Sequence, residues 1–132
     1  MSSRDQNAAV VRAYADAWRK GDAAALVGLY ADDFTLHYFG HSPLAGDHTG
    51  KAAALATLAR VQQLTNRKLI DVHDVLAGDD HGTIFARERW ERDGRTLDVQ
   101  RVLVYHTQNG LLSECWVFDD DQQAVDEFWN DA

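Results

Sequence analysis

Residues 21–50 read GDAAALVGLYADDFTLHYFGHSPLAGDHTG, and the structural signals in this segment organise the rest of the chain. Asp22 suits the N-cap of a short helix, whose apolar stripe runs from Leu26 to Tyr30. From Phe34 onward apolar and polar side chains alternate, which indicates a strand. A loop rich in Gly and titratable residues follows, and such groups at a strand end are typical of the mouth of a pocket.

Length and composition limit the classes of protein to which the chain can belong. Its 132 residues, 45% hydrophobic and 26% charged, predict one globular domain over residues 1–132. No apolar run approaches the roughly 20 residues of a membrane span, and MSSRDQNAAVV lacks the features of a secretory signal, so we expect a cytoplasmic protein. The net charge of −8 opposes binding to nucleic acid or to an anionic membrane.

Three further helices are expected around the opening segment. Asp5–Lys20 carries apolar residues at three- and four-residue spacings, and Gly21 stands at its C-cap position. Thr49 is expected to cap a helix that runs to about Leu64. The acidic residues 119–121 precede the apolar residues of a closing helix, where negative charge is favourable.

The second half of the chain has the period-two pattern of strands. The expected strands are Arg67–Leu76, Thr83–Arg92, Arg95–Thr107 and Leu111–Asp119. Asp93-Gly94 and Asn109-Gly110 favour tight hairpin turns between the last three. Helices followed by such strands predict an α+β fold, in which a curved antiparallel sheet wraps around the N-terminal helices to form a cone with an internal pocket.

Four segments carry a resemblance to a known family. They are Tyr14 with Asp22, GDAAALVGLYADDFTL at 21–36, RDGRTLDV at 92–99 and NGLLSECW at 109–116. Together they resemble the nuclear transport factor 2-like superfamily, which includes ketosteroid isomerases, SnoaL-like polyketide cyclases and limonene epoxide hydrolases. The resemblance implies a cystatin-like α+β barrel, but members of this fold are enzymes, ligand binders or adaptors.

The resemblance also implies roles for particular residues. Tyr14 stands where the isomerases have an oxyanion-hole tyrosine, Tyr38 where they have the catalytic aspartate, and Arg101 where they have a second oxyanion donor. Because two of these three parts are replaced, steroid isomerisation by the usual route is not expected. Trp116 stands where the isomerases wall their pocket, which implies a stacking surface for a flat ligand.

The late hairpin predicts an interior ion pair. If Arg101 faces the cavity, period two places Val99, Leu103 and Tyr105 there too. A tight turn pairs Ala86 with Arg101, which puts Glu88 diagonal to Arg101. A bidentate pair with Glu88 would leave guanidinium donors for a substrate carbonyl. The alternative, with both charged groups on the outer face, requires only a one-residue slip in register.

Histidines are the candidate bases. His37 and Tyr38 are neighbours on a strand, so only one of them can face the cavity, and the resemblance favours Tyr38. His41, or His37, could take a proton from a carbon acid while Tyr14 and Arg101 stabilise the oxyanion. The candidate catalytic residues are therefore Tyr14, His37, Tyr38, His41, Arg101 and Asp119, and the candidate ligand-binding residues are Trp18, Glu88, Val99, Leu103 and Trp116.

Two of these interpretations have structural alternatives. Asp119 could be a base on the last strand or could cap the closing helix. His37, His41 and His48 could be metal ligands, but their spacings match no compact zinc signature, so neither a metal nor another cofactor is expected.

The expected function is that of a SnoaL-like enzyme that moves a proton on an apolar, carbonyl-bearing metabolite, as an isomerase, cyclase or lyase without cofactor. The alternatives are a non-catalytic module for apolar ligands or dimerisation, and activation of water as in epoxide hydrolases. Val102 and Val104 lie on the face opposite Arg101, which predicts a homodimer through the outer face of the sheet.

Overall fold

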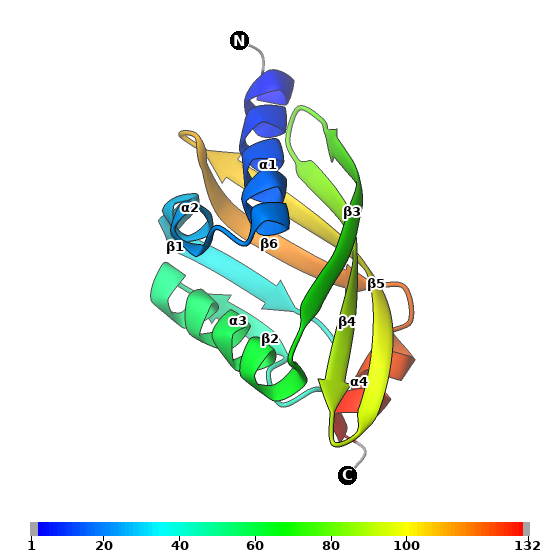
Figure 1. The fold of residues 1–132 in the computed structure, drawn as a ribbon. Helices are drawn as coiled ribbons and strands as arrows, with labels where there is room; N and C mark the ends of the chain where they lie inside the picture. Colours follow the sequence, from blue (N-terminus) through cyan, green and yellow to red (C-terminus); the bar gives the residue numbers. More distant parts are fainter. Residues whose placement is uncertain (1–2, 131–132) are drawn as a thin grey trace.

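The computed structural model describes residues 3–130, in which four helices and six strands follow one another (Figure 1). They are α1 (Ser3–Lys20), α2 (Ala23–Gly28), β1 (Tyr30–Tyr38), β2 (Gly46–Thr49), α3 (Lys51–Thr65), β3 (Lys68–Ala77), β4 (Gly82–Arg92), β5 (Arg95–Gln108), β6 (Leu111–Asp119) and α4 (Gln122–Asn130). The fold is α+β, as predicted. None of the described helices is long and apolar enough to cross a bilayer.

The strands form one curved sheet in the order β2-β1-β6-β5-β4-β3 (Figure 1). The sheet does not close into a barrel, since β2 and β3 are its edges. All neighbouring strands are antiparallel except β1 and β6, which run parallel. The prediction of an antiparallel sheet is corrected at this one pair. Parallel strands need a long crossover connection, and most of the chain lies between β1 and β6.

Two tight turns set the register of β4, β5 and β6. Asp93 and Gly94 have φ of 52° and 77°, and Asn109 and Gly110 have φ of 54° and 79°. Positive φ at both central residues is the mark of the type I′ hairpin that the sequence predicted. Across the first turn Ala86 is opposite Arg101, which is the pairing expected from the sequence.

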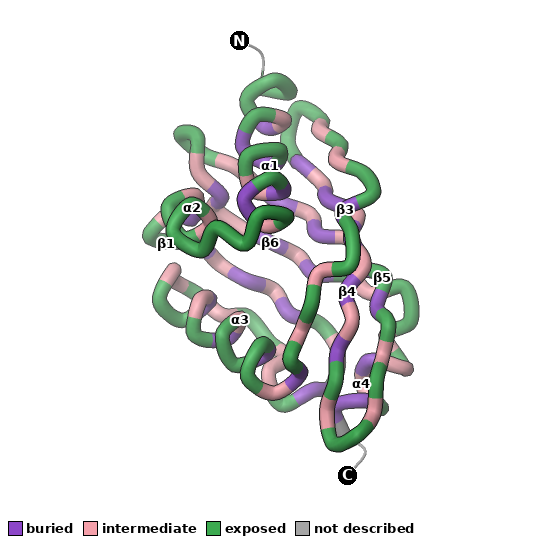
Figure 2. The backbone as a smooth tube through the Cα atoms, in the orientation of Figure 1, coloured by how far each residue is buried: buried purple, intermediate pink, exposed green. Residues whose placement is uncertain are grey.

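The helices α1 and α3 cover the concave face of the sheet (Figure 1). Buried and partly exposed residues alternate along β4 and β5, so one face of each strand belongs to the core (Figure 2). Gly82 at the start of β4 allows α1 to approach closely, because a Cβ at this position would clash with Val11. The curved face and the helices above it therefore enclose the interior of the protein.

Some helix and strand boundaries differ from those predicted. The second helix ends at Gly28, and Tyr30 is the first residue of β1 rather than part of a helical stripe. The loop before Gly50 contains the short strand β2, which pairs with β1 and includes Thr49. Gly50 is consequently the N-cap of α3, and no side chain caps this helix.

Candidate functional site

A cavity of about 270 Å³ lies between the concave face of the sheet and helices α1, α2 and α3. Its walls are largely apolar and include Leu26, Leu36, Leu55, Leu58, Leu103 and Val117. The volume lies just below the roughly 300–1,000 Å³ of pockets for drug-sized ligands, so the cavity suits a compact molecule. Most of its polar side chains belong to two groups, one around Arg101 and one around Tyr14.

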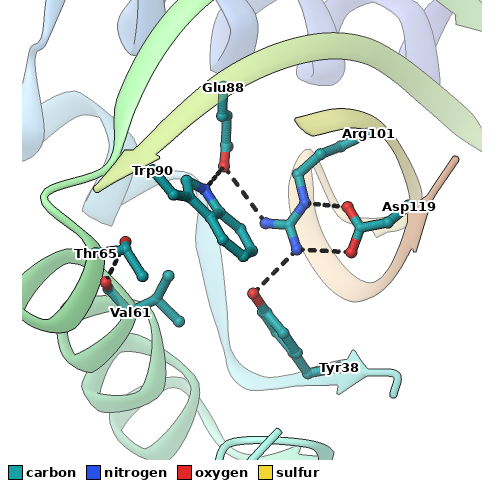
Figure 3. A network of polar contacts seen from close by, with 7 residues as sticks. All are labelled: Tyr38, Val61, Thr65, Glu88, Trp90, Arg101 and Asp119. Atoms are coloured by element: carbon teal, nitrogen blue, oxygen red, sulfur yellow. Dashed lines mark hydrogen bonds and ion pairs between the residues drawn. The ribbon is translucent and has the colours of Figure 1, made fainter. Parts of the chain in front are cut away.

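The first group, called here the charged cluster, consists of Tyr38, Glu88, Arg101 and Asp119 (Figure 3). Arg101 Nε donates a hydrogen bond to Asp119 Oδ1 at 2.6 Å, and Nη2 donates to Oδ2 at 3.1 Å. Nη2 also donates to the Tyr38 hydroxyl at 3.0 Å. Ala86 is the residue of β4 opposite Arg101, and its small side chain leaves room for the guanidinium. Asp119 therefore makes the bidentate pair that the sequence analysis assigned to Glu88.

Glu88 is bound through only one of its carboxylate oxygens. Oε1 accepts a hydrogen bond from Trp90 Nε1 at 2.9 Å and lies 3.5 Å from Arg101 Nη1 (Figure 3). Within residues 3–130, Oε2 of Glu88 accepts no hydrogen bond. Glu88 is nonetheless only 1% exposed and lines the cavity. A buried carboxylate oxygen is therefore open to a ligand in the cavity.

The charges in this cluster are unequal. One guanidinium faces two carboxylates, which leaves a formal charge of about −1 in a site away from water when both are ionised. Burial alone would lower the pKa of Arg101, but Tyr38, Asp119 and Glu88 raise it well above its usual value, so the guanidinium stays charged. Trp90 adds a cation–π contact, with the guanidinium carbon 4.8 Å from its ring centre.

Tyr38 is a neutral hydrogen-bond donor in this cluster. Burial raises its pKa, although the charge of Arg101 acts in the opposite direction. Its oxygen accepts the hydrogen bond from Arg101, and among the described residues its own proton has no acceptor. Because Tyr38 lines the cavity, this O–H can donate to a ligand oxygen.

The second polar group, called here the tyrosine cluster, consists of Tyr14, Tyr30, Tyr105 and Cys115. The hydroxyls of Tyr14 and Tyr30 are 2.5 Å apart, and the rings of Tyr14 and Tyr105 have centres 5.5 Å apart. Burial raises the pKa of all three tyrosines and raises the pKa of Cys115 to about 12. The cluster is therefore uncharged at neutral pH.

The two clusters lie apart along the sheet. Arg101 and Tyr105 are four residues apart on β5, which corresponds to roughly 13 Å at about 3.3 Å per residue. Tyr14 packs against Tyr105, whereas Arg101 points toward Tyr38 and Asp119. Tyr14 and Arg101 thus belong to different clusters of the same cavity, and no hydrogen bond among the described residues joins them; that both stabilise one oxyanion stays a prediction.

Most of the residues predicted to bind ligand surround the cavity. Trp18, Glu88 and Leu103 line it, and Val99 is buried beside Glu88 in the core without lining it. The prediction that Trp116 lines the pocket is corrected, since this side chain lies on the outer face and stacks on His37 with ring centres 5.3 Å apart. Asp119 faces inward, and residues three apart in a strand point to opposite faces, so Trp116 must face outward.

The predicted histidine bases lie outside the cavity. His37 is on the outer face, where it contacts Asp47 and Glu114. The side chain of His41 is 89% exposed and contacts Asp126 of α4. Both hypotheses of a histidine base in the cavity are therefore corrected: β1 turns Tyr38 inward and His37 outward, and His41 is held by α4.

The remaining predictions concern His48 in the loop and Asp119 on the last strand. His48 contacts the Leu44 carbonyl, and in residues 3–130 no three His, Cys, Asp or Glu side chains are grouped as metal ligands. Asp121 caps α4 through the Ala124 N–H, so Asp119 is not needed for capping. Instead Asp119 is buried beneath Arg101 and does not line the cavity.

The sequence analysis did not name several polar residues of the cavity. Tyr30 was assigned to a helical stripe, and Arg67 was assigned only to the start of a strand. Neither Cys115, which lines the cavity, nor Trp90, which orients Glu88, was among the predicted site residues. The alternation along β5 did predict Tyr105, which shares the face of Arg101 and lines the cavity.

Comparisons with known proteins agree with this architecture. The family model of the SnoaL-like domain matches residues 11–115. The solved structure of Bal32a, from a soil-derived mobile gene cassette, is 32% identical, with a TM-score of 0.87 over 98% of this chain and 100% of that chain. A Xanthomonas campestris protein with a cystatin-like fold is 25% identical, with a TM-score of 0.84 over 98% of each chain.

Another solved structure shares the fold at lower identity. TerC, co-crystallized with polyporic acid, is 15% identical, with a TM-score of 0.77 over 96% of this chain and 99% of that chain. At this identity the match shows the fold alone. A search of curated proteins found no significant match.

Proposed function

This chain belongs to the SnoaL-like family of the nuclear transport factor 2-like superfamily, and on that premise we propose that it moves a proton on a compact, apolar, carbonyl-bearing molecule without a cofactor. The observation that carries the proposal is the charged cluster, which presents one carboxylate oxygen and one neutral O–H to an apolar cavity. A water-poor site strengthens such interactions.

Glu88 is the proposed proton acceptor. It is the one carboxylate among the described residues that line the cavity, and its Oε2 is open to a ligand. Trp90 and Arg101 bind Oε1, which holds the carboxylate in one orientation. Glu88 thus takes the role that the sequence analysis gave to His37 or His41.

Tyr38 is the proposed donor to the substrate oxygen. The C–H bond next to the carbonyl breaks, its proton goes to Glu88 Oε2, and its electron pair becomes the C=C bond of an enolate. The negative charge that develops on the oxygen is stabilised by the O–H of Tyr38, which Arg101 polarises from behind. Return of the proton to another carbon gives isomerisation, and attack of the enolate on a second carbonyl gives cyclisation.

Activation of water, as in epoxide hydrolases, is a second candidate because Glu88, Arg101 and Asp119 form a carboxylate–guanidinium–carboxylate array. Both oxygens of Asp119 are bound by Arg101, and this residue does not line the cavity. Only one carboxylate can then reach a ligand, which favours proton abstraction over a mechanism that needs two.

Hydrogen–deuterium exchange tests the proposal without knowledge of the final product. A set of small cyclic ketones and unsaturated carbonyl compounds is incubated with the protein in deuterium oxide, and loss of the C–H signal is followed by NMR. We expect exchange with the wild-type protein and a loss of at least about 100-fold in Glu88→Gln, since general-base catalysis contributes roughly 10²–10⁴-fold.

The control variant is Glu91→Gln, which changes an exposed carboxylate that does not line the cavity and should leave exchange unchanged. Thermal unfolding confirms that both variants remain folded. Equal exchange in the wild type and Glu88→Gln would refute the assignment of Glu88. Hydrolysis of small epoxides, with no exchange of any carbonyl compound, would support the second candidate.

We also propose that the outer face of the sheet binds a second copy of this chain. Phe39 and Phe118 are 41% and 46% exposed and stack with ring centres 5.1 Å apart, beside Val102. The same face carries the basic Arg87 and the acidic Glu114, so a two-fold copy can oppose unlike charges. Light scattering should give a dimer for the wild type and a monomer for Phe118→Asp, and a monomeric wild type would contradict this proposal.

A further inference from the structure

Arg67 is a cation that lines the cavity and has no hydrogen-bond or ion-pair partner among residues 3–130. It follows the C-cap of α3, precedes β3 and is half-buried. It lines the same cavity as Glu88 and Tyr38. Within residues 3–130, its guanidinium makes no hydrogen bond, ion pair or cation–π contact, whereas Arg101 uses four contacts. A half-buried cation in an apolar cavity is costly unless something pairs with it.

The Gln62 amide and the Tyr14–Tyr30 hydroxyl pair also line the cavity and can donate hydrogen bonds to a ligand. Gln62 is an exposed residue of α3 that also lines the cavity, and its side-chain amide has no hydrogen-bond partner among the described residues. Burial raises the pKa of Tyr14 and Tyr30, and the charge of Arg67 acts against this shift at both hydroxyls, which means that its field reaches them. Arg67 and Gln62 offer N–H donors, and the hydrogen bond between Tyr14 and Tyr30 uses one of their two hydroxyl protons and leaves the other. A carboxylate only accepts hydrogen bonds, so it matches these donors.

We infer that Arg67 is the anchor for an anionic oxygen of the ligand, so the substrate class is a small apolar carboxylic acid. This inference rests on the proposed function and adds a ligand charge to it. The carboxylate would pair with Arg67, and the apolar body would lie along Leu55 and Leu58 toward the charged cluster. The positive charge of Arg67 would also offset repulsion between the anion and Glu88.

Matched acids and amides test the inference directly, since each pair differs in charge and hardly in size. The probes are benzoate and benzamide, cinnamate and cinnamamide, and 2-naphthoate and 2-naphthamide, titrated by calorimetry at pH 7 and low salt. We expect at least one acid to bind about tenfold or more tightly than its amide, because a hydrogen bond to a charged group is stronger than a neutral one. Arg67→Gln should remove that difference by weakening the acid alone.

The matched control is Arg60→Gln, which removes the same charge from an exposed site on α3 that does not line the cavity. It should leave the preference for the acid intact, which excludes a general effect of net charge. Circular dichroism shows whether Arg67→Gln is folded, and its unchanged affinity for the amide is a second check.

The outcomes separate this inference from the proposed function. Equal binding of acid and amide by the wild type, or an undiminished preference in Arg67→Gln, would overturn the role of Arg67 and leave the cavity as a ligand site. Absence of binding by every probe, together with absence of carbonyl exchange, would overturn both.

Discussion

The two ends of the cavity bury polar groups in opposite ways. The charged cluster holds two carboxylates and one guanidinium, whereas the tyrosine cluster holds three hydroxyls and one thiol that are neutral at pH 7. Burying an ion costs several kcal/mol unless a partner compensates it, but a hydroxyl needs only a hydrogen bond. Loss of one charged residue is therefore most costly in the charged cluster, where it leaves a buried charge uncompensated.

This difference indicates where chemistry and recognition belong. A group that exchanges a proton with substrate must have two accessible protonation states, and Glu88 in the charged cluster is the carboxylate that meets the cavity. The buried tyrosines retain their protons and suit uncharged contacts with a ligand. The comparison leads to four predictions.

Asp119→Asn is expected to have the largest effect on stability. It leaves the buried guanidinium of Arg101 without its bidentate partner, and breaking a buried pair typically costs about 3–5 kcal/mol of unfolding free energy. Urea denaturation measures this loss. The control is Asp98→Asn, which breaks the exposed pair with Arg89 and should leave the midpoint almost unchanged. Similar midpoints for both variants would show that the charged cluster is hydrated.

Cys115 should be almost unreactive in the folded protein. Burial raises its pKa from 9.0 to about 12, so the thiolate fraction at pH 8 falls about a thousandfold. Alkylation by iodoacetamide, followed by mass spectrometry, gives one signal because the chain has one cysteine. The same chain unfolded in guanidinium chloride is the reference. A native rate within tenfold of that reference would mean that water enters the tyrosine cluster.

Removing single hydroxyls compares the two ends directly. Tyr38→Phe takes an acceptor from the charged Nη2 of Arg101, so we expect a loss of about 1–3 kcal/mol in unfolding free energy. Tyr30→Phe removes a bond between neutral hydroxyls, which corresponds to about 1 kcal/mol. Chemical denaturation of both variants measures the difference. The opposite order would indicate that Asp119 alone satisfies the guanidinium.

Alkaline titration should affect stability only at the end of the pH range. All four tyrosines line the cavity, namely Tyr14, Tyr30, Tyr38 and Tyr105, and burial raises the pKa of each above the ordinary value of 10.0. The unfolded chain therefore loses these protons first as pH rises. Their contribution to stability is complete below about pH 10 and declines above it.

Absorbance of tyrosinate and circular dichroism, recorded in one titration, measure this behaviour. We expect both signals to change together, because the tyrosines ionise only when the chain unfolds. Tyrosinate absorbance near pH 10 in a protein that keeps its fold would show that the tyrosine cluster is open to solvent.

Local signals in the sequence were sufficient for the hairpins and for the central ion pair. Asp-Gly and Asn-Gly turns set the pairing of β4, β5 and β6, and this pairing brings Glu88 to Arg101. Period two then places Leu103 on the same face as Arg101. These features depend on residues close in sequence, whose geometry is limited by backbone sterics.

Other parts of the site depended on contacts between distant segments. The bidentate partner of Arg101 is Asp119, 18 residues later, rather than Glu88. His41 is held by α4, and its contact Asp126 is 85 residues away. Trp116 lies on the outer face, as its three-residue separation from Asp119 requires, although the resemblance implied a pocket wall.

The sequence alone determined the order of the helices and strands except β2, the turn chemistry and the side chains that share a strand face. Only the tertiary structure decided that β1 runs parallel to β6 and that Tyr14 and Arg101 belong to different clusters. It also decided that Arg67 lines the cavity without an ion-pair partner among residues 3–130. The physical reason is that alternation and turn propensity act over a few residues. Long-range pairing depends on the sum of many weak packing contacts across the whole chain.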